Sequence, residues 1–215
     1  MLLKAIACLS GIAAILILAE ILWRKKTLKG EYARKLVHIL AGIFVASWPW
    51  LISWHAIQFL GVAMLAGVLV NNQLKILHAI NGLRAKFYSH CYYAIAITAC
   101  ALITTQKAFF AVAILTMALA DGFAAIAGCT LGKKWGYKVF GQPKTVIGSM
   151  AFWLTSMCVL GAGILLVGNA IDFGHYALLM IFLPPGLMVL ENVAIYGTDN
   201  IVIPVAVLMA LNLAR

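Results

Sequence analysis

Long apolar runs follow one another almost end to end along this chain of 215 residues. Each run extends over about 16–22 residues, the length that a helix needs to cross a hydrocarbon core of about 30 Å. Only 10% of the residues are charged and the mean hydropathy is +1.03, whereas an average soluble domain has roughly 25% charged residues. A soluble globule needs a polar exterior that this chain lacks, so the pattern excludes one and indicates a membrane protein.

Polar and glycine-containing breaks divide the apolar runs into about eight helices that we expect to span the membrane. We expect them to form an all-α, polytopic helical bundle, a single transmembrane domain over residues 1–215 with no separate soluble domain. The predicted spans are residues 3–22, 35–52, 56–71, 91–105, 108–128, 149–168, 176–195 and 200–214.

The basic residues predict how this bundle is oriented, because lysine and arginine accumulate in cytoplasmic loops. With the N-terminus outside, the inner loops at 23–35, 72–90 and 129–148 hold every basic residue except Lys4, Lys107 and Arg215. We therefore expect a multi-pass protein of the cell membrane with its N-terminus outside. The net charge of +10 then reflects these loops and anionic headgroups, and we expect no nucleic-acid partner.

Two acidic residues, Asp121 and Glu191, lie inside predicted spans. An ionisable side chain at membrane depth costs about 2.5–3.5 kcal/mol on insertion scales, so its presence indicates function. Asp121 shares one helical face with Ala125, Gly128 and Gly132, and these small residues let a ligand or another backbone come close. The alternative for Asp121 is a buried ion pair or an interhelical hydrogen bond.

A polar stripe enters the second predicted span from the inner side. Helical spacing places Glu31, Arg34, Lys35 and His38 on one face, followed by Gly42. The stripe reaches from the cytoplasm to membrane depth, which favours contact with a charged ligand. Arg34 and Lys35 have the alternative of simple positive-inside anchors, and His38 that of a packing hydrogen bond.

The basic loop before the sixth span combines glycines with Lys133, Lys134, Lys138 and Lys144. Its end, from Thr145 through Gly148 to Ser149, opens a helix whose free N–H groups suit phosphate. The alternative is a juxtamembrane loop that binds acidic lipids.

The last inner turn carries Asp199 and Asn200, which either contribute to the same site or cap the final helix. The predicted topology brings residues of four separate segments to the inner face, and we expect them to form one pocket for a phosphate-bearing ligand from the cytosol. Carboxylates that hold Mg²⁺ beside lysine and arginine are what phosphoryl or nucleotidyl transfer requires. These residues are Glu31, Arg34, Lys35, His38, Asp121, Lys144, Ser149, Glu191, Asp199 and Asn200.

Four motifs together resemble the CTP-dependent membrane lipid kinases, namely the phytol, dolichol and yeast-type diacylglycerol kinases. They are R-K-L-V-H-I-L-A-G at 34–42, A-D-G-F-A-A-I-A-G-x-x-x-G at 120–132, K-T-V-I-G-S-M-A-F at 144–152 and E-N-x(6)-D-N-x-x-x-P at 191–204. The resemblance covers residues 31–204. Phosphatidate cytidylyltransferases share the Lys-Thr-x-x-Gly-Ser element, but their C-terminal signature is missing here.

The resemblance implies a kinase that uses Mg²⁺ and CTP to phosphorylate the hydroxyl of a long-chain lipid alcohol. Asp121, His38 and Lys144 are the expected catalytic residues, and Asp121, Glu191 and Asp199 the expected metal ligands. The expected nucleotide and phosphate contacts are Arg34, Lys35, Gly128, Gly132, Lys133, Thr145, Gly148, Ser149 and Asn200.

Two other functions remain open from the sequence. A related enzyme would make a CDP-lipid instead of a lipid phosphate. A transporter would use Asp121 and Glu191 as a cation or proton relay. That function needs polar residues through the outer half of the bundle, where this sequence has almost none.

Overall fold

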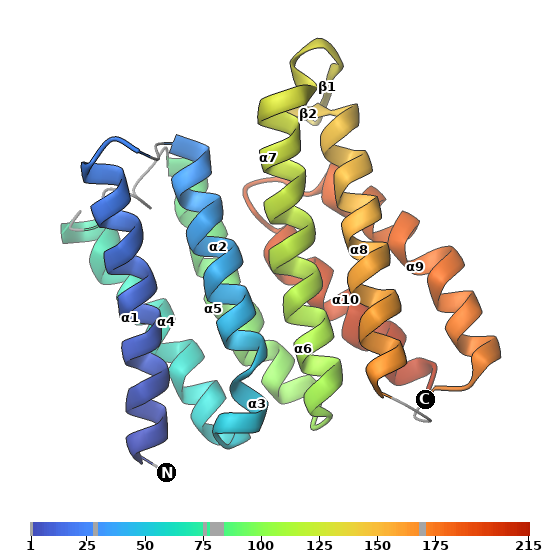
Figure 1. Cartoon of the computed structure of the whole chain (residues 1–215), viewed down its shortest axis with the longest axis horizontal. Helices are drawn as coiled ribbons and strands as arrows, with labels where there is room; N and C mark the ends of the chain where they lie inside the picture. Colours follow the sequence, from blue (N-terminus) through green and yellow to red (C-terminus); the bar gives the residue numbers. More distant parts are fainter. Residues whose placement is uncertain (1, 28–29, 75–76, 78–83, 168–170) are drawn as a thin grey trace.

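The chain folds into an all-α, polytopic membrane protein (Figure 1). The structure is a computed structural model that describes residues 2–27, 30–74, 77, 84–167 and 171–215. Within these residues, five helices are long and apolar enough to cross a membrane: Leu3–Arg24, Trp54–Leu74, Lys107–Leu131, Val146–Leu165 and Phe173–Val193. Phe87–Ile103 and Asp199–Leu213 are shorter apolar helices. Large side chains such as Phe59 and Phe173 point outward, as expected of surfaces that face lipid.

Each of the eight predicted spans has a helical counterpart. The second ends early at Ala46, because Pro49 lacks an N–H and cannot continue the helix; Pro49 lies in the first turn of a separate short helix that begins at Trp48. The elements are α1 (Leu2–Arg24), α2 (Gly30–Ala46), α3 (Trp48–Leu51), α4 (Trp54–Leu74), α5 (Arg84–Ile103), α6 (Lys107–Leu115), the π-helical turn η1 (Thr116–Ala120), α7 (Asp121–Leu131), the 3₁₀ turn η2 (Gly132–Lys134), β1 (Gly136–Val139), β2 (Gln142–Thr145), α8 (Val146–Val167), α9 (Phe173–Val193) and α10 (Asp199–Leu213).

The rod formed by α6, η1 and α7 is the centre of the bundle. In its most apolar stretch 72% of the residues are buried, against 11–39% in the other four long helices. Phe109, Phe110 and Met117 of this rod are almost completely buried. The π-helical turn η1 ends directly before Asp121, and such turns occur frequently at functional sites. The central rod therefore carries Asp121, one of the two acidic residues predicted inside a membrane span.

The basic loop predicted at 129–148 contains a small β-hairpin, which the sequence analysis missed. Strands β1 and β2 pair antiparallel with Tyr137 opposite Lys144. The turn residues Phe140 and Gly141 both have positive φ, 46° and 79°, as a two-residue hairpin turn requires. The hairpin leads directly into α8 and so fixes Lys144 beside the first turn of that helix.

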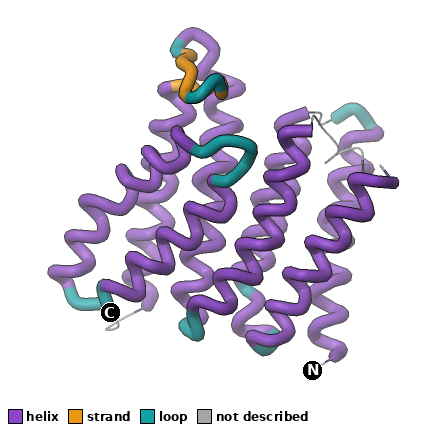
Figure 2. The backbone as a smooth tube through the Cα atoms, turned by 180° about the vertical axis from the view of Figure 1, so that it is seen from behind, coloured by secondary structure: helices purple, strands orange, loops and turns teal. Residues whose placement is uncertain are grey.

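The two ends of the bundle differ in charge as the sequence predicts. Figure 1 shows both chain termini and the start of α6 at one end, which places Lys4, Lys107 and Arg215 there. The hairpin and the start of α2 lie at the opposite end, and Figure 2 shows the hairpin and the connection between α9 and α10 from behind. The side of the membrane that each end faces remains a prediction.

Candidate functional site

A polar cavity of about 720 Å³ lies between α2, α7, the hairpin, the start of α8 and the connection from α9 to α10. Four of the six acidic residues in the chain line it: Glu31, Asp121, Glu191 and Asp199. The cations Arg34, Lys35 and Lys144 line the same cavity. Residues far apart in the sequence thus meet at one place, and Asp121 and Lys144 share it.

Asp121 is the centre of a buried ionic cluster. The Lys35 ammonium donates to Asp121 Oδ2, and the two side chains are only 3% and 10% exposed. His38 Nε2 lies 3.2 Å from the same carboxylate oxygen. The His38 ring also stands edge-on to Tyr93, with 4.9 Å between the ring centroids. The predicted polar stripe of α2 therefore meets α7 at the acidic residue of the central rod.

Lys144 forms a second ionic pair on the other side of the cavity. Its ammonium donates to the Glu191 carboxylate and, over 2.8 Å, to the backbone carbonyl of Glu191. Asn192, the next residue, accepts hydrogen bonds from Ser149 Oγ at 3.1 Å and from the Tyr137 hydroxyl. These contacts hold the hairpin and α8 against the end of α9, so the position of Lys144 is fixed from two sides.

Arg34 and Asp199 also line the cavity with charged side chains. Asn200, a predicted nucleotide contact, does not line it. The Arg34 guanidinium pairs with Glu31 one helical turn earlier. The Asn200 side chain is buried and its Nδ2 donates to Ser89 Oγ over 2.7 Å. Successive helical residues point about 100° apart, so Asp199 faces the cavity while Asn200 faces α5. Asn200 therefore makes a contact between helices in this structure, and its predicted nucleotide contact stays a prediction.

The predicted phosphate-facing glycines have a packing role. A Cβ on Gly128, Gly132 or Gly148 would lie 2.6–2.8 Å from Thr145 Oγ1. Thr145 Oγ1 also accepts from Gly148 N at 3.0 Å and so caps the first turn of α8. Gly128 and Gly148 still line the cavity, but Gly132 does not. The side chain of Lys133 lies outside the part that the structure describes.

The donor set fits a cation that arrives together with phosphate. Within the described residues, no group of three or more His, Cys, Asp or Glu side chains is arranged to hold a metal ion. Asp121, Glu191 and Asp199 line one cavity, but Asp121 and Glu191 are each bound to a lysine. Mg²⁺ is usually held by one or two protein carboxylates and by substrate phosphates. The oxygen ligands present therefore suit a metal–phosphate complex better than a metal ion alone.

Several residues around the cavity have no counterpart in the sequence prediction: Ser89, Tyr137, Asn192 and Tyr196. The sequence signal for the hairpin of Tyr137 was weak, because Gly141 suits a two-residue turn but Phe140 is not a typical residue at positive φ. Asn192 stood inside a recognised motif, next to Glu191. No sequence signal pointed to Ser89, which comes from α5 and reaches the site only through tertiary packing.

The fold and the cavity define a class: a multi-pass membrane protein with an ion-paired, carboxylate-rich cavity at one end of its helices. Over 204 residues the chain is 28% identical to a protein of Synechocystis sp. described as phytol kinase. The match covers 90% of this chain and 83% of that relative. No family model matches the chain, and no solved structure matches it.

Proposed function

We propose that this protein is an integral-membrane lipid kinase. It transfers the terminal phosphoryl group of a nucleotide, CTP by the motif resemblance, to the hydroxyl of a long-chain alcohol such as phytol, a polyprenol or diacylglycerol. The observation that carries the proposal is that Asp121 and Lys144, from separate segments, line one cavity together with Arg34 and Lys35. The similarity to a phytol kinase supports it.

In this proposal the cations bind phosphate by exchanging partners. Lys35 and Lys144 are bound to Asp121 and Glu191 in the structure, so the cavity stays nearly neutral without a ligand. A triphosphate offers these lysines stronger acceptors than a single carboxylate, and Arg34 adds a guanidinium suited to two phosphate oxygens. The exchange releases two carboxylates inside the cavity.

Asp121, Glu191 and Asp199 are the residues that would hold Mg²⁺ in this enzyme. When bound, the ion neutralises charge on the phosphate oxygens, which is most of what phosphoryl transfer requires. The Tyr137 hydroxyl hydrogen-bonds to Ser149 and Asn192, which holds the hairpin in place and so keeps Lys144 on the phosphate side of the cavity.

His38 is our candidate for the general base. In the reaction, the alcohol oxygen forms a bond to the γ-phosphorus, and the bond from that phosphorus to the β–γ bridging oxygen breaks. The hydroxyl proton passes to His38, and the products are a lipid monophosphate and the nucleoside diphosphate. His38 lies 3.2 Å from Asp121 Oδ2, so the carboxylate orients the imidazole and stabilises it once it is protonated.

The cavity faces the cytoplasm in this proposal. Its end of the bundle carries the basic loops, and positive loops stay in the cytoplasm. The nucleotide then enters from the cytosol, and the lipid approaches from the bilayer between helices.

The test is a transfer assay with purified protein, Mg²⁺ and labelled nucleotide. We expect γ-label from CTP to enter an alcohol in a panel of phytol, farnesol, polyprenol and diacylglycerol. Parallel reactions with ATP identify the donor. We expect Asp121→Asn to lower kcat by about 100-fold or more, the size of effect seen when a group stabilising transition-state charge is lost. The matched control is Asp172→Asn, in the connection before α9, where the acidic residue is exposed.

Lys144→Ala and its control Lys138→Ala test the second half of the cavity, since both lysines belong to the hairpin but Lys138 is exposed. The proposal fails if no alcohol takes up γ-label, or if Asp121→Asn is as active as the parent. Transfer of α-label into lipid would instead identify a cytidylyltransferase.

A further inference from the structure

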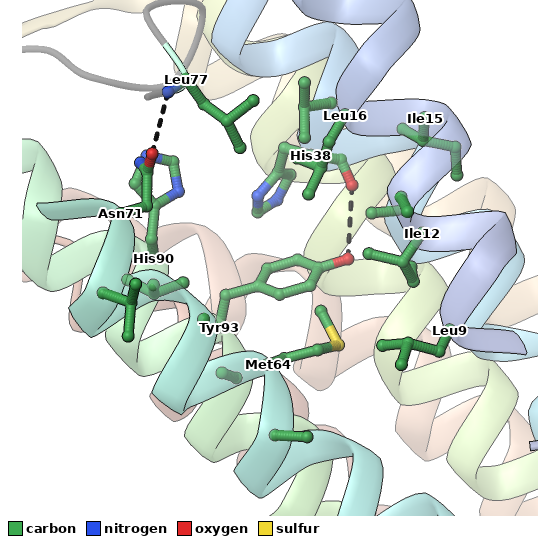
Figure 3. A pocket seen from close by; sticks show the side chains of 18 of the residues that line it. Leu9, Ile12, Ile15, Leu16, His38, Met64, Asn71, Leu77, His90 and Tyr93 are labelled. Atoms are coloured by element: carbon green, nitrogen blue, oxygen red, sulfur yellow. Dashed lines mark hydrogen bonds between the residues drawn. The ribbon is translucent and has the colours of Figure 1, made fainter. Parts of the chain in front are cut away.

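A second cavity of about 420 Å³ lies between α1, α2, α4 and α5. Helix α2 lines both this cavity and the charged cavity. Its lining is mostly aliphatic. Figure 3 shows Leu9 and Ile12 of α1 facing Met64 and Tyr93 across this space. A cavity of this size falls within the range of about 300–1,000 Å³ typical of small-molecule sites.

The polar side chains that line this cavity are Arg34 and His38, next to the charged site, and Asn71, His90 and Tyr93 from α4 and α5. Arg34 lines both cavities. His38 lines the apolar one, while its Nε2 lies 3.2 Å from Asp121 in the charged one. The Tyr93 hydroxyl donates to the His38 carbonyl at 3.4 Å (Figure 3). Two residues of α2 therefore connect a hydrocarbon-lined space to the carboxylate at the centre of the site.

The cavity has the length and the opening for one hydrocarbon chain. Its wall on α2 runs from Arg34 to Ala41, which at 1.5 Å per residue is about 10 Å along the helix. Ala13 of α1 and Gly67 of α4 line it and are exposed at the surface of the bundle. A chain longer than the cavity can continue between these two helices into the bilayer.

We propose that this cavity binds the head-proximal part of a single-chain alcohol, with the hydroxyl at His38 and Arg34, and that it excludes two-chain lipids. The inference rests on the proposed kinase function and specifies its acceptor as a prenyl-type alcohol and not diacylglycerol. Hydrocarbon is as well solvated in a bilayer as in this cavity, so selectivity comes from shape and from the buried polar end. A hydroxyl gains a partner at that end which the bilayer core does not offer.

Gly67 allows the cavity to be filled without disturbing the fold. A Cβ at Gly67 would meet no atom within 4 Å, so a phenylalanine there can enter the cavity. Gly186 of α9 has the same open surroundings and lines neither cavity. Replacing glycine inside a helix does not lower helix propensity. Gly67→Phe and Gly186→Phe are therefore a matched pair.

The experiment is photolabelling in nanodiscs without nucleotide, using a C20 prenyl alcohol with a diazirine on its chain. We expect crosslinks on the segments of α1 and α4 that line the cavity, and competition by phytol but not by diacylglycerol. Gly67→Phe should lower this labelling at least about tenfold, since overpacking a filled site is strongly unfavourable. Gly186→Phe should label like the parent.

The inference is overturned if crosslinks map elsewhere, if diacylglycerol competes as well as phytol, or if Gly67→Phe labels normally. Labelling needs no turnover, so it separates this inference from the kinase proposal. If the protein labels as expected but transfers no phosphate, the proposal for the apolar cavity stands and the kinase proposal fails. If the Gly67→Phe variant phosphorylates phytol at the parent rate, the kinase proposal stands and the proposal for the apolar cavity fails.

Discussion

The buried pair between Lys35 and Asp121 gives a prediction whose size follows from its burial. Lys35→Met removes the ammonium and leaves the Asp121 carboxylate, only 10% exposed, without its main partner. Breaking a buried pair in this way typically costs about 3–5 kcal/mol. His38, 3.2 Å from the same oxygen, remains as a hydrogen-bond partner of the carboxylate. We therefore expect the lower end of this range, about 3 kcal/mol.

The double variant Lys35→Met/Asp121→Asn removes both charges and should recover most of that loss. A neutral pair of similar volume costs little once neither partner is left charged. The expected coupling energy is about 2–3 kcal/mol, within the range for residues in contact. Reversible unfolding in mixed micelles of dodecyl maltoside and SDS, followed by far-UV circular dichroism, measures each free energy of unfolding.

Lys138→Met is the control, because Lys138 is an exposed lysine on the hairpin and surface changes usually stay within about 0.5 kcal/mol. Additive losses in the double variant would refute the reasoning, since they would mean that Lys35 and Asp121 do not interact. A loss below about 1 kcal/mol for Lys35→Met would refute the claimed burial.

Three further changes test other parts of the fold and site. Gly61→Ala should lower the free energy of unfolding by about 1–3 kcal/mol, because its Cβ would lie 2.2 Å from Thr98 Oγ1 and 3.2 Å from the Thr98 nitrogen; an unchanged unfolding midpoint would contradict the close approach of α4 and α5. Hydrogen bonds from the backbone N–H of His175 and, to a smaller extent, from the His175 side chain lower the pKa of Asp172. The ionised Asp172 side chain therefore stabilises the start of α9 fully at pH values above the usual Asp pKa of about 3.9. This stabilisation is lost as the pH falls through the lowered pKa. The Tm difference between the parent and Asp172→Ala should therefore be present at neutral pH and vanish in acid, and a difference independent of pH would count against this contact. Ser149→Ala should raise KM for the nucleotide several-fold, because the hydrogen bond between Ser149 and Tyr137 of the hairpin is lost; transfer assays over a nucleotide range check this, and an unaltered KM would show that the hairpin is fixed by other contacts.

The positions of the helices were predictable because apolar run length is a strong signal of membrane depth. The same signal predicted Asp121 and Glu191 on the inner halves of their spans, and the basic loops predicted Lys144 near them. Depth and side predicted that these residues share one pocket, and in the structure all three line the same cavity.

Rotation about the helix axis was predictable for α2, whose polar stripe meets Asp121, but not for helices such as α10 in which nearly every face is apolar. Asn200 was expected in the cavity and instead contacts Ser89. Gly132 was expected at phosphate and instead makes room for Thr145. The π-helical turn before Asp121 also left no trace in the sequence, because it depends on how the central rod packs against its neighbours.

The central claim is that a metal-bound nucleotide occupies the cavity between Asp121 and Lys144. The most direct measurement is the experimental structure of the protein in nanodiscs with Mg²⁺ and a non-hydrolysable CTP analogue. We predict triphosphate density in this cavity, with Lys35 and Lys144 turned from their carboxylates toward phosphate. Nucleotide density at another surface, or an unchanged pair of ion bridges at saturating analogue, would contradict the claim.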